Sequence, residues 1–301
     1  MIACIEFNRK DIRPEGISRN CNAHDHFSHY TAAISMRCPL LRSPGNRKMP
    51  VMISSREDRI PLLPPRTLRD IRIKQLVRRF LYPLTIFLRQ RKISSFLAQT
   101  QEPKLHVGCG INILPGWLNT DQGTILNRRG VIYLDARKKL PFYNDTIHYV
   151  FSEHFITCLS MDETTNFIHE SYRVLKPGGS LRIASVMWPF LAELYGNSGD
   201  RYERYVQWAT NTFLKTRQNS SLLVLNNLLY GFGCKSIYDV PTLSAMLVTA
   251  GFAQIVRCNV GESSHSALRG VEGHGKVIPP EFNELETTVL EATKPVNANV
   301  G

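Results

Sequence analysis

The chain has 301 residues, of which 43% are hydrophobic, and a formal net charge of +12. This length accommodates one large domain or two small ones, and the composition is ordinary for a protein with a sizeable core. No run of about eighteen apolar residues occurs, which argues against a membrane-spanning helix. The opening stretch, MIACIEFNRKDIRPEG, has charges where a secretory signal has apolar residues, so we expect no signal peptide.

The charge is concentrated in the first third of the chain. Residues 1–100 contain 19 Lys and Arg against 7 Asp and Glu, whereas residues 101–301 contain 18 of each. The larger, neutral part therefore needs no polyanionic partner. The seven Cys are scattered and form no C-x-x-C pair, which favours reduced thiols and a cytoplasmic location over a disulfide framework.

Residues 1–60 are expected to form a poorly ordered extension, because they show no sustained apolar period and are rich in Arg, Ser, Asn and Pro. A Cys and three His lie close together in this part, at Cys21, His24, His26 and His29. The cluster is either a metal clip or incidental. A structural metal site usually has paired ligands in a folded frame, so we favour the incidental alternative and predict no metal.

Residues 61–100 are predicted to form a basic, amphipathic helical arm. Within residues 66–99 an apolar stripe recurs at approximately helical spacing, formed by Ile71, Ile73, Leu76, Phe80 and Leu81. Pro83 should break or kink this helix. The stripe either packs on the next domain, which we favour, or lies on an acidic membrane surface as a peripheral contact.

From residue 104 onward, predicted strands and helices alternate. The expected strands are KLHVG, WLNTD, VIYLDA (131–136), IHYVFS (147–152), SLRIASV, QIVRCNV and TTVLEAT. A helix is expected at SMDETTNFIHESYRVLK, with a capping box between Ser160 and Glu163, ended by a Pro-Gly-Gly turn. A helical insertion follows at about residues 190–235, and PTLSAMLVTAGF is a further helix stopped by Gly251. This alternation predicts an α/β fold with a largely parallel sheet over residues 101–295.

The stretch KLHVGCGINILPGWLNTD predicts a ligand site. Gly108 and Gly110 follow the first strand, where the absence of a Cβ lets a ligand approach the backbone. A dinucleotide site would have a third Gly at position 113, but Ile113 occupies it. The segment from Gly110 to Asp121 is also too short for a helix and a second strand. The pattern therefore favours a nucleoside without a pyrophosphate, with Asp121 accepting both ribose hydroxyls.

The combination of motifs resembles the class I S-adenosylmethionine-dependent methyltransferases. GCG, an Asp that ends the second strand, LDARKKLPFYNDTIHYVFSEH and RVLKPGGSLRIA occur in order. The chain is most similar to a small bacterial-type branch with LHVGCG, LPGWLN, SEH and a late ESSHSALRG and NELETTVLEA. The resemblance covers about residues 104–295. It implies a Rossmann-like, mostly parallel seven-stranded sheet and S-adenosyl-L-methionine as cofactor.

The resemblance also implies roles for individual residues. The methionine end of the cofactor would contact Gly108, Cys109 and Gly110, and Asp121 would hold the ribose. The adenine edge would meet Asp135 and Ala136. The residues that leave the fourth strand would face the transferable methyl group: Ser152 on the cofactor side, with Glu153 and His154 in the catalytic position.

Three departures from the pattern of the family bear on these roles. His148 stands where the family usually has Asp, which affects support of the strand. Thr157 and Cys158 replace a frequent Glu-His pair, and Cys234 replaces a usual His. The last two departures bear on the substrate and on full activity.

Methyl transfer from a sulfonium needs mainly alignment and exclusion of water, and a base only when the acceptor carries a proton. His154 is either that base or a structural residue bonded to nearby backbone. His265, Arg269 and His274 lie in a long polar loop, where they either bind substrate, which we favour, or satisfy the loop.

Three functions remain open from the sequence. The main hypothesis is an enzyme that methylates a small-molecule or glycan-like acceptor. A nucleic-acid methyltransferase that uses the basic arm is the second, although the neutral part lacks a basic stripe with interleaved aromatic residues. The third is a non-catalytic binding module with a cofactor fold, tethered by its basic helix.

Overall fold

The computed structural model describes residues 68–124, 130–196, 199–214, 216 and 218–296. The chain divides into two units at residues 72 and 73, and the description concerns the larger one, which contains residues 73–296. The predictions for residues 1–60, including the Cys21–His29 cluster, lie outside the described residues.

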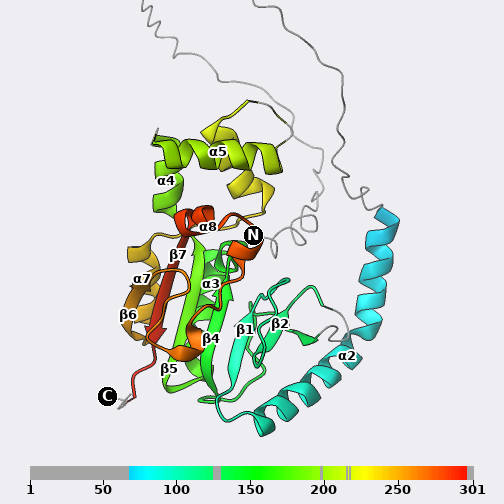
Figure 1. Cartoon of the computed structure of the whole chain (residues 1–301). Coiled ribbons are helices and arrows are strands. Elements are labelled where there is room, and N and C mark those ends of the chain that lie inside the picture. Colours follow the sequence, from blue (N-terminus) through cyan, green and yellow to red (C-terminus); the bar gives the residue numbers. More distant parts are fainter. Residues whose placement is uncertain (1–67, 125–129, 197–198, 215, 217, 297–301) are drawn as a thin grey trace, which may run out of the picture. The chain divides into compact units, whose positions relative to one another are not determined.

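The basic arm is one helix, α2 (Leu68–Gln99), which continues through Pro83. Figure 1 shows that α2 changes direction along its length, as expected for a helix with an internal proline. Ile93 is 2% exposed in the main core, and the Tyr82 ring meets the edge of Tyr133 at a centroid distance of 5.8 Å. Part of the arm therefore packs on the domain through residues beyond the predicted stripe, whereas Phe80 of that stripe is 74% exposed, so the favoured packing is wrong at Phe80. No helix among the described residues is long and apolar enough to cross a membrane.

A single seven-stranded sheet forms the centre of the domain (Figure 1). Its order is β3-β2-β1-β4-β5-β7-β6, and only β7 runs antiparallel to its neighbours. The strands are β1 (Lys104–Val107), β2 (Leu118–Asp121), β3 (Val131–Tyr133), β4 (Ile147–Glu153), β5 (Leu175–Val186), β6 (Ala253–Cys258) and β7 (Thr287–Thr293). The predicted Rossmann-like fold with a mostly parallel sheet is thus confirmed.

Helices connect the strands and cover the sheet. They are α3 (Met161–Val174), α7 (Val240–Thr249) and α8 (Pro280–Glu286), with the short turns η2 (Ile156–Cys158), η4 (Ser266–Leu268) and η5 (His274–Lys276). The capping box of α3 is present as predicted: Ser160 accepts from the Glu163 amide, and Glu163 accepts from the Ser160 amide.

The helical insertion follows β5 and has a hydrophobic cluster of its own. It consists of α4 (Trp188–Gly196), α5 (Asp200–Phe213), α6 (Ser221–Asn226) and the π-helical turn η3 (Asn227–Gly231). Figure 1 shows α4 and α5 beyond the end of the sheet at which β5 leaves it. The insertion therefore lies near the carboxyl ends of the central strands, where the site is expected.

The structure corrects one prediction about the local fold. Helix α3 ends at Val174, and the Pro-Gly-Gly sequence lies inside β5 instead of forming a turn before it. The pairing with β4 shifts there, so that the extra residues form an irregularity in the strand. Gly178 adopts a φ of +79°, and its amide donates to the Lys294 carbonyl. Long-range pairing with the end of β7 thus outweighs the local turn tendency.

Candidate active site

The turn after β1 presents its backbone to the carboxyl end of the sheet. Gly108 and Gly110 both have positive φ, at 66° and 52°. A Cβ at Gly108 would lie 2.6 Å from the Phe155 ring, so a side chain is excluded there. The Gly110 amide donates to Asp121 Oδ2 at 3.1 Å. The ends of β1 and β2 are therefore tied together around a bare stretch of backbone.

A pocket on the β2 and β3 side of this turn contains several of the predicted cofactor residues. It is lined by Val107, Gly108, Asp121, Gln122, Leu134, Asp135, Ala136, Arg137, Phe155, Cys158, Leu159 and Lys235. The Asp121 carboxylate is half-buried and also accepts from the Gly123 amide. Each carboxylate oxygen has two acceptor positions, which leaves capacity for ribose hydroxyls.

Asp135 is engaged by its neighbour Arg137. The Arg137 Nε and Nη2 atoms donate to its two oxygens at 2.8 and 3.0 Å. Burial raises the pKa of Asp135, but the hydrogen bonds and charge of Arg137 outweigh it and hold the pKa below its usual value. The carboxylate is thus an ionised, preorganised acceptor at the pocket wall.

Two buried groups beneath the turn, Cys109 and His106, stay uncharged at neutral pH. Burial, and then the charge of Asp121, raise the pKa of the Cys109 thiol to about 12, so it stays protonated. Burial lowers the pKa of His106 to about 4, against the opposing effect of the hydrogen bond that its Nδ1 donates to Asn119 Oδ1. Among the described cysteines, Cys109, Cys234 and Cys258 are free thiols.

A second pocket lies on the β4 side of the same turn. Its lining consists of His106, Gly108, Cys109, Gly110, Ile111, Asn112, Glu153, His154, Gly273, His274 and Val277. Gly108 lines both pockets, so the two adjoin at this glycine. The three residues of the GCG motif, predicted to contact the methionine end of the cofactor, form the wall of the second pocket.

Glu153 holds the loop that closes the second pocket. Its carboxylate accepts from the Gly273 amide at 2.9 Å and from the His274 amide at 3.0 Å, and Asn112 donates to it at 3.4 Å. Through these hydrogen bonds Glu153 positions the loop, and the catalytic role expected from the sequence stays a prediction. Ser152 is fully buried in β4, and its hydroxyl makes no hydrogen bond within the described part of the chain.

His154 is deeply buried and conformationally strained. Its φ is 48°, in the left-handed region that non-glycine residues rarely adopt, and it is 2% exposed. Burial, and then the neighbouring His274, hold its pKa well below the usual value. The imidazole therefore remains neutral at physiological pH and is a weak proton acceptor.

Two departures from the family pattern meet beside His154. Thr157 and Cys234 line one small apolar cavity with His154, and the Lys235 amide donates to the Thr157 carbonyl at 2.8 Å. Cys234 donates to the Leu228 carbonyl at 3.1 Å, and burial raises its pKa. The two substitutions therefore change one environment, on the side of His154 that faces the insertion.

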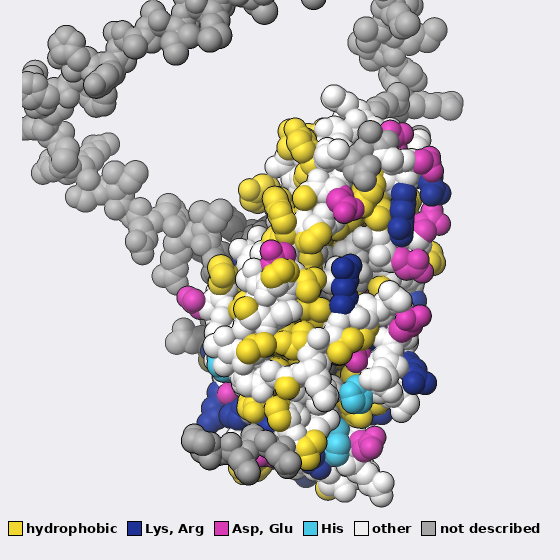
Figure 2. Space-filling view, turned by 90° about the vertical axis from the view of Figure 1, so that its left-hand side faces the viewer, with side chains coloured by type: hydrophobic (Ala, Val, Ile, Leu, Met, Phe, Trp, Pro, Cys, Tyr) yellow, Lys and Arg dark blue, Asp and Glu magenta, His cyan; other side chains and the backbone are white. Residues whose placement is uncertain are grey.

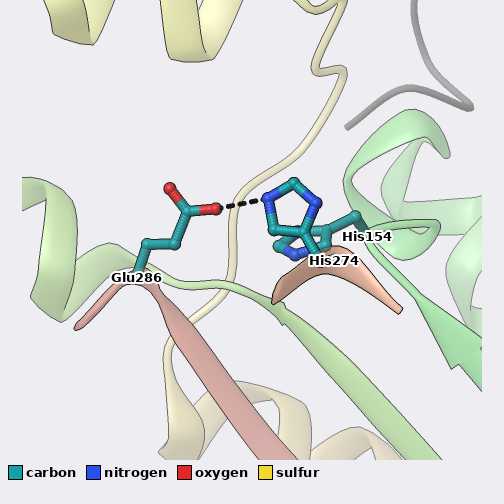
Figure 3. Close-up of side chains that lie close together, drawn as sticks. All are labelled: His154, His274 and Glu286. Carbon is teal, nitrogen blue, oxygen red and sulfur yellow. Dashed lines mark hydrogen bonds and ion pairs between the residues drawn. The ribbon is translucent and has the colours of Figure 1, made fainter. Parts of the chain in front are cut away.

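Of the three loop residues predicted to bind substrate, the structure brings only His274 to the pocket. Its ring lies 4.2 Å from that of His154, centroid to centroid, and its Nε2 donates to Glu286 Oε1 at 2.9 Å (Figure 3). His265 instead bonds Ser180 at 3.0 Å, in the first half of β5. Arg269 donates to the Ser263 carbonyl on the surface. The latter two satisfy the loop, which was the alternative interpretation.

The sequence analysis missed the groups that hold this loop from below. Arg182, fully buried on β5, donates through Nε to Glu272 at 2.6 Å and through Nη1 to Glu291. Tyr205 on α5 donates to Glu286. The sequence signal that would have identified Arg182 is a charged residue inside an otherwise apolar strand, as in SLRIASV. Nothing local pointed to Tyr205.

The distribution of charge on the surface bears on whether the protein binds a nucleic acid. Figure 2 shows hydrophobic side chains scattered over this face among other side chains and backbone, with separate Lys and Arg side chains in its middle and at its margins. Among the described residues drawn there, the basic side chains form no continuous stripe of the kind that tracks a nucleic-acid backbone.

Comparison with known proteins agrees with the fold. A family described as a methyltransferase domain matches residues 109–183, a quarter of the chain that runs from the glycine turn into β5. The sheet order and the antiparallel β7 agree with this match, which supports a methyltransferase domain with a Rossmann-like fold in this part of the chain. A search of curated protein sequences gives no match.

Solved structures with a similar fold include three methyltransferases. One, from Mesorhizobium loti, is 17% identical, with 67% of this chain and 96% of that chain covered and a TM-score of 0.39. A possible histamine N-methyltransferase from Thermotoga maritima is 17% identical, with 71% and 94% covered and a TM-score of 0.37.

The third is phosphoethanolamine N-methyltransferase 2 of Haemonchus contortus, in complex with S-adenosyl-L-methionine. It is 18% identical, with 65% of this chain covered and a TM-score of 0.38. This chain spans about half of its length, since 49% of that chain is covered. The TM-scores of these structures lie below 0.5.

Proposed function

We propose that this protein is an enzyme that transfers a methyl group from S-adenosyl-L-methionine to a small-molecule or glycan-like acceptor. One observation carries the proposal: two pockets of different chemistry adjoin at Gly108, at the carboxyl ends of the parallel strands. The first pocket has the carboxylates of Asp121 and Asp135, and the second has two imidazoles, His154 and His274.

The two pockets match the two ends of the reaction. The nucleoside lies in the first pocket, with its ribose on Asp121 and its adenine beside Asp135 and Ala136. The methionine part crosses the bare backbone at Gly108, and the sulfonium methyl faces the second pocket, where the acceptor binds. The protein aligns the acceptor with an already activated methyl group, and the loop held by Glu153 excludes water.

Two other proposals from the sequence have less support. The neutral charge of residues 101–301 and the mixed surface of Figure 2 do not favour a nucleic-acid acceptor. A binding module without turnover would need no ordered second pocket. A cytoplasmic location and a peripheral membrane contact of residues 66–99 remain predictions from the sequence.

The test is incubation of the purified protein with methyl-labelled cofactor and a fractionated cell extract. We expect label in a small-molecule or glycan fraction, with one equivalent of S-adenosylhomocysteine formed per methyl group transferred. Label in RNA that salt releases from the protein supports the nucleic-acid alternative. Cofactor binding by calorimetry without labelled product in any fraction identifies a non-catalytic module.

A further inference from the structure

We propose that His274, held by Glu286 and Tyr205, is the general base of methyl transfer, and that the acceptor is therefore a group that loses a proton, a hydroxyl or an amine. The inference rests on the proposed function and adds to it the catalytic residue and the chemical class of the acceptor atom. It assigns the proton to His274 and not to His154, the base considered from the sequence.

The hydrogen bonds of His274 select its tautomer. Nε2 lies 2.9 Å from Glu286 Oε1, and a carboxylate can only accept, so Nε2 carries the proton. Tyr205 also donates to Glu286, because burial, and then the Glu286 charge, raise the pKa of Tyr205 well above its usual value. The other ring nitrogen, Nδ1, makes no hydrogen bond with any described residue and lies on the side of the ring away from Glu286 (Figure 3). Its lone pair is available to a ligand in the second pocket.

The backbone of the His274 turn is positioned by charged groups from other elements. The amides of Gly273 and His274 donate to Glu153, at the end of β4. Glu272, the residue before them, is ion-paired with the fully buried Arg182. A Cβ at Gly273 would lie 2.3 Å from the Asn112 side chain, so the turn also packs against the glycine-rich loop. Few surface loops are held in this way, and a base must be held within hydrogen-bonding reach of its proton.

His154 supports the base without being one. Its ring centroid lies 4.2 Å from that of His274, and the two ring planes are tilted at 57° to each other. His154 is the more deeply buried of the two, at 2% against 7% exposed. Its low pKa keeps it neutral, so it does not repel the charge that His274 acquires. The titratable groups that face His274 are thus Glu286 at the end of α8, Tyr205 on α5, Glu153 at the end of β4 and His154 directly after it, with exposed Lys276 on its own turn.

The proton and electron balance is simple. The lone pair of the acceptor oxygen or nitrogen attacks the sulfonium methyl carbon, and the C–S bond breaks with its electron pair going to sulfur. The acceptor proton moves to His274 Nδ1. The positive charge that began on sulfur thus ends on the imidazolium, where the Glu286 carboxylate stabilises it through the Nε2 proton.

A metal site is the alternative interpretation of His154, His274 and Glu286. Donor atoms of His154, His274 and Glu286 all lie within 4.8 Å of one another and are buried. However, His274 Nε2 already donates to the Glu286 carboxylate, so this nitrogen offers no lone pair to a metal ion. We therefore favour the proton acceptor, and the test below includes metal binding.

The test compares His274→Gln with His169→Gln, an exposed histidine on α3. Transfer of label from methyl-labelled cofactor into the extract fraction labelled by the native protein is measured between pH 5 and 9. We expect His274→Gln to lower turnover by about 10²–10⁴ and to abolish the acidic limb of the profile, with calorimetric affinity for S-adenosylhomocysteine unchanged. His169→Gln should behave as the native protein. The limb should persist in His154→Asn, whose side chain tolerates the left-handed backbone.

Two measurements keep the inference separable from the proposed function. In ¹⁵N-histidine-labelled protein, NMR should show His274 protonated on Nε2 with Nδ1 unprotonated, and Glu286→Gln should disturb that tautomer. Labelled product from the native protein with full turnover in His274→Gln would overturn the base while leaving methyl transfer intact. One equivalent of a divalent metal in the purified native protein, lost in His274→Gln, would overturn it in favour of a metal site. No labelled product from the native protein would defeat the proposed function itself.

Discussion

The proposed cofactor end of the site, the pocket around Asp121 and Asp135, and its proposed acceptor end, the pocket around His154 and His274, are held by different kinds of contact. At the cofactor end, Asp121 and Asp135 are held by groups within a few residues of them or at the adjacent strand end, such as Gly110 and Arg137. At the acceptor end, His154, Tyr205, His274 and Glu286 come from four separate elements of the chain. The first end is half-exposed and the second is buried.

The two pockets should differ in how strongly their function depends on the stability of the fold. A local, half-exposed site can bind a cofactor with little dependence on the rest of the fold. A buried charged site gains stronger electrostatic interactions but depends on partners far away in the sequence. Substitutions should therefore damage the acceptor end mainly through the fold and the cofactor end mainly through affinity.

The largest effect is expected at Arg182. Arg182→Met leaves Glu272 and Glu291 buried without their partner, and burial already holds the pKa of Glu272 above its usual value. The free energy of unfolding should fall by about 3–5 kcal/mol, measured by urea denaturation. Arg257→Met, exposed on β6, is the control and should change it by less than about 0.5 kcal/mol. A loss below about 1 kcal/mol would show that the buried network does not stabilise the acceptor end.

The pH dependence of stability should contain a large contribution from His106. Its folded pKa is about 4, below the unfolded value of about 6.5, so the unfolded chain binds the proton first. The contribution is complete above pH 6.5 and is lost as the pH falls toward 4, by roughly 3 kcal/mol. His106→Phe retains a ring beside Phe151 and should remove this slope in urea titrations at several pH values. An unchanged slope would mean that His106 titrates normally.

A smaller loss is expected where the two ends meet. Gly108→Ala places a side chain at a φ of 66° and within 2.6 Å of the Phe155 ring. We expect about 1–3 kcal/mol of destabilisation together with weaker cofactor binding, measured by thermal unfolding and calorimetry. Gly130→Ala is the matched control, because Gly130 has a φ of 77° but nothing within 4 Å of its Cβ position. Equal losses in the two variants would assign the whole effect to backbone strain.

The smallest effect is expected at the cofactor end. Asp121→Asn keeps the shape of the side chain but removes the charge that strengthens its hydrogen bonds to ribose, so affinity for S-adenosylhomocysteine should fall about tenfold. The free energy of unfolding should change little. Asp162→Asn, exposed in the first turn of α3, should leave the affinity unchanged. Unchanged affinity in Asp121→Asn would reject the ribose assignment.

The sequence by itself determined most of the helices and strands. Apolar runs, the capping box at Ser160 and the glycine turn before Asp121 depend on contacts within a few residues, and each appears in the structure as predicted. Where a long-range contact competed with a local one, the prediction was wrong: the Pro-Gly-Gly stretch was expected as a turn, and pairing with β7 places it inside β5.

Only the tertiary structure decided the acceptor end. Sequence analysis selected His154, His265 and Arg269 along with His274, because a histidine in a loop looks the same whether it is buried or exposed. Burial distinguishes them: it makes His154 a weak base, leaves His265 and Arg269 away from the pocket, and pairs His274 with Glu286. That pairing depends on the order in which β7, α8 and the insertion return to the end of the sheet, and no local pattern specifies a contact of that range.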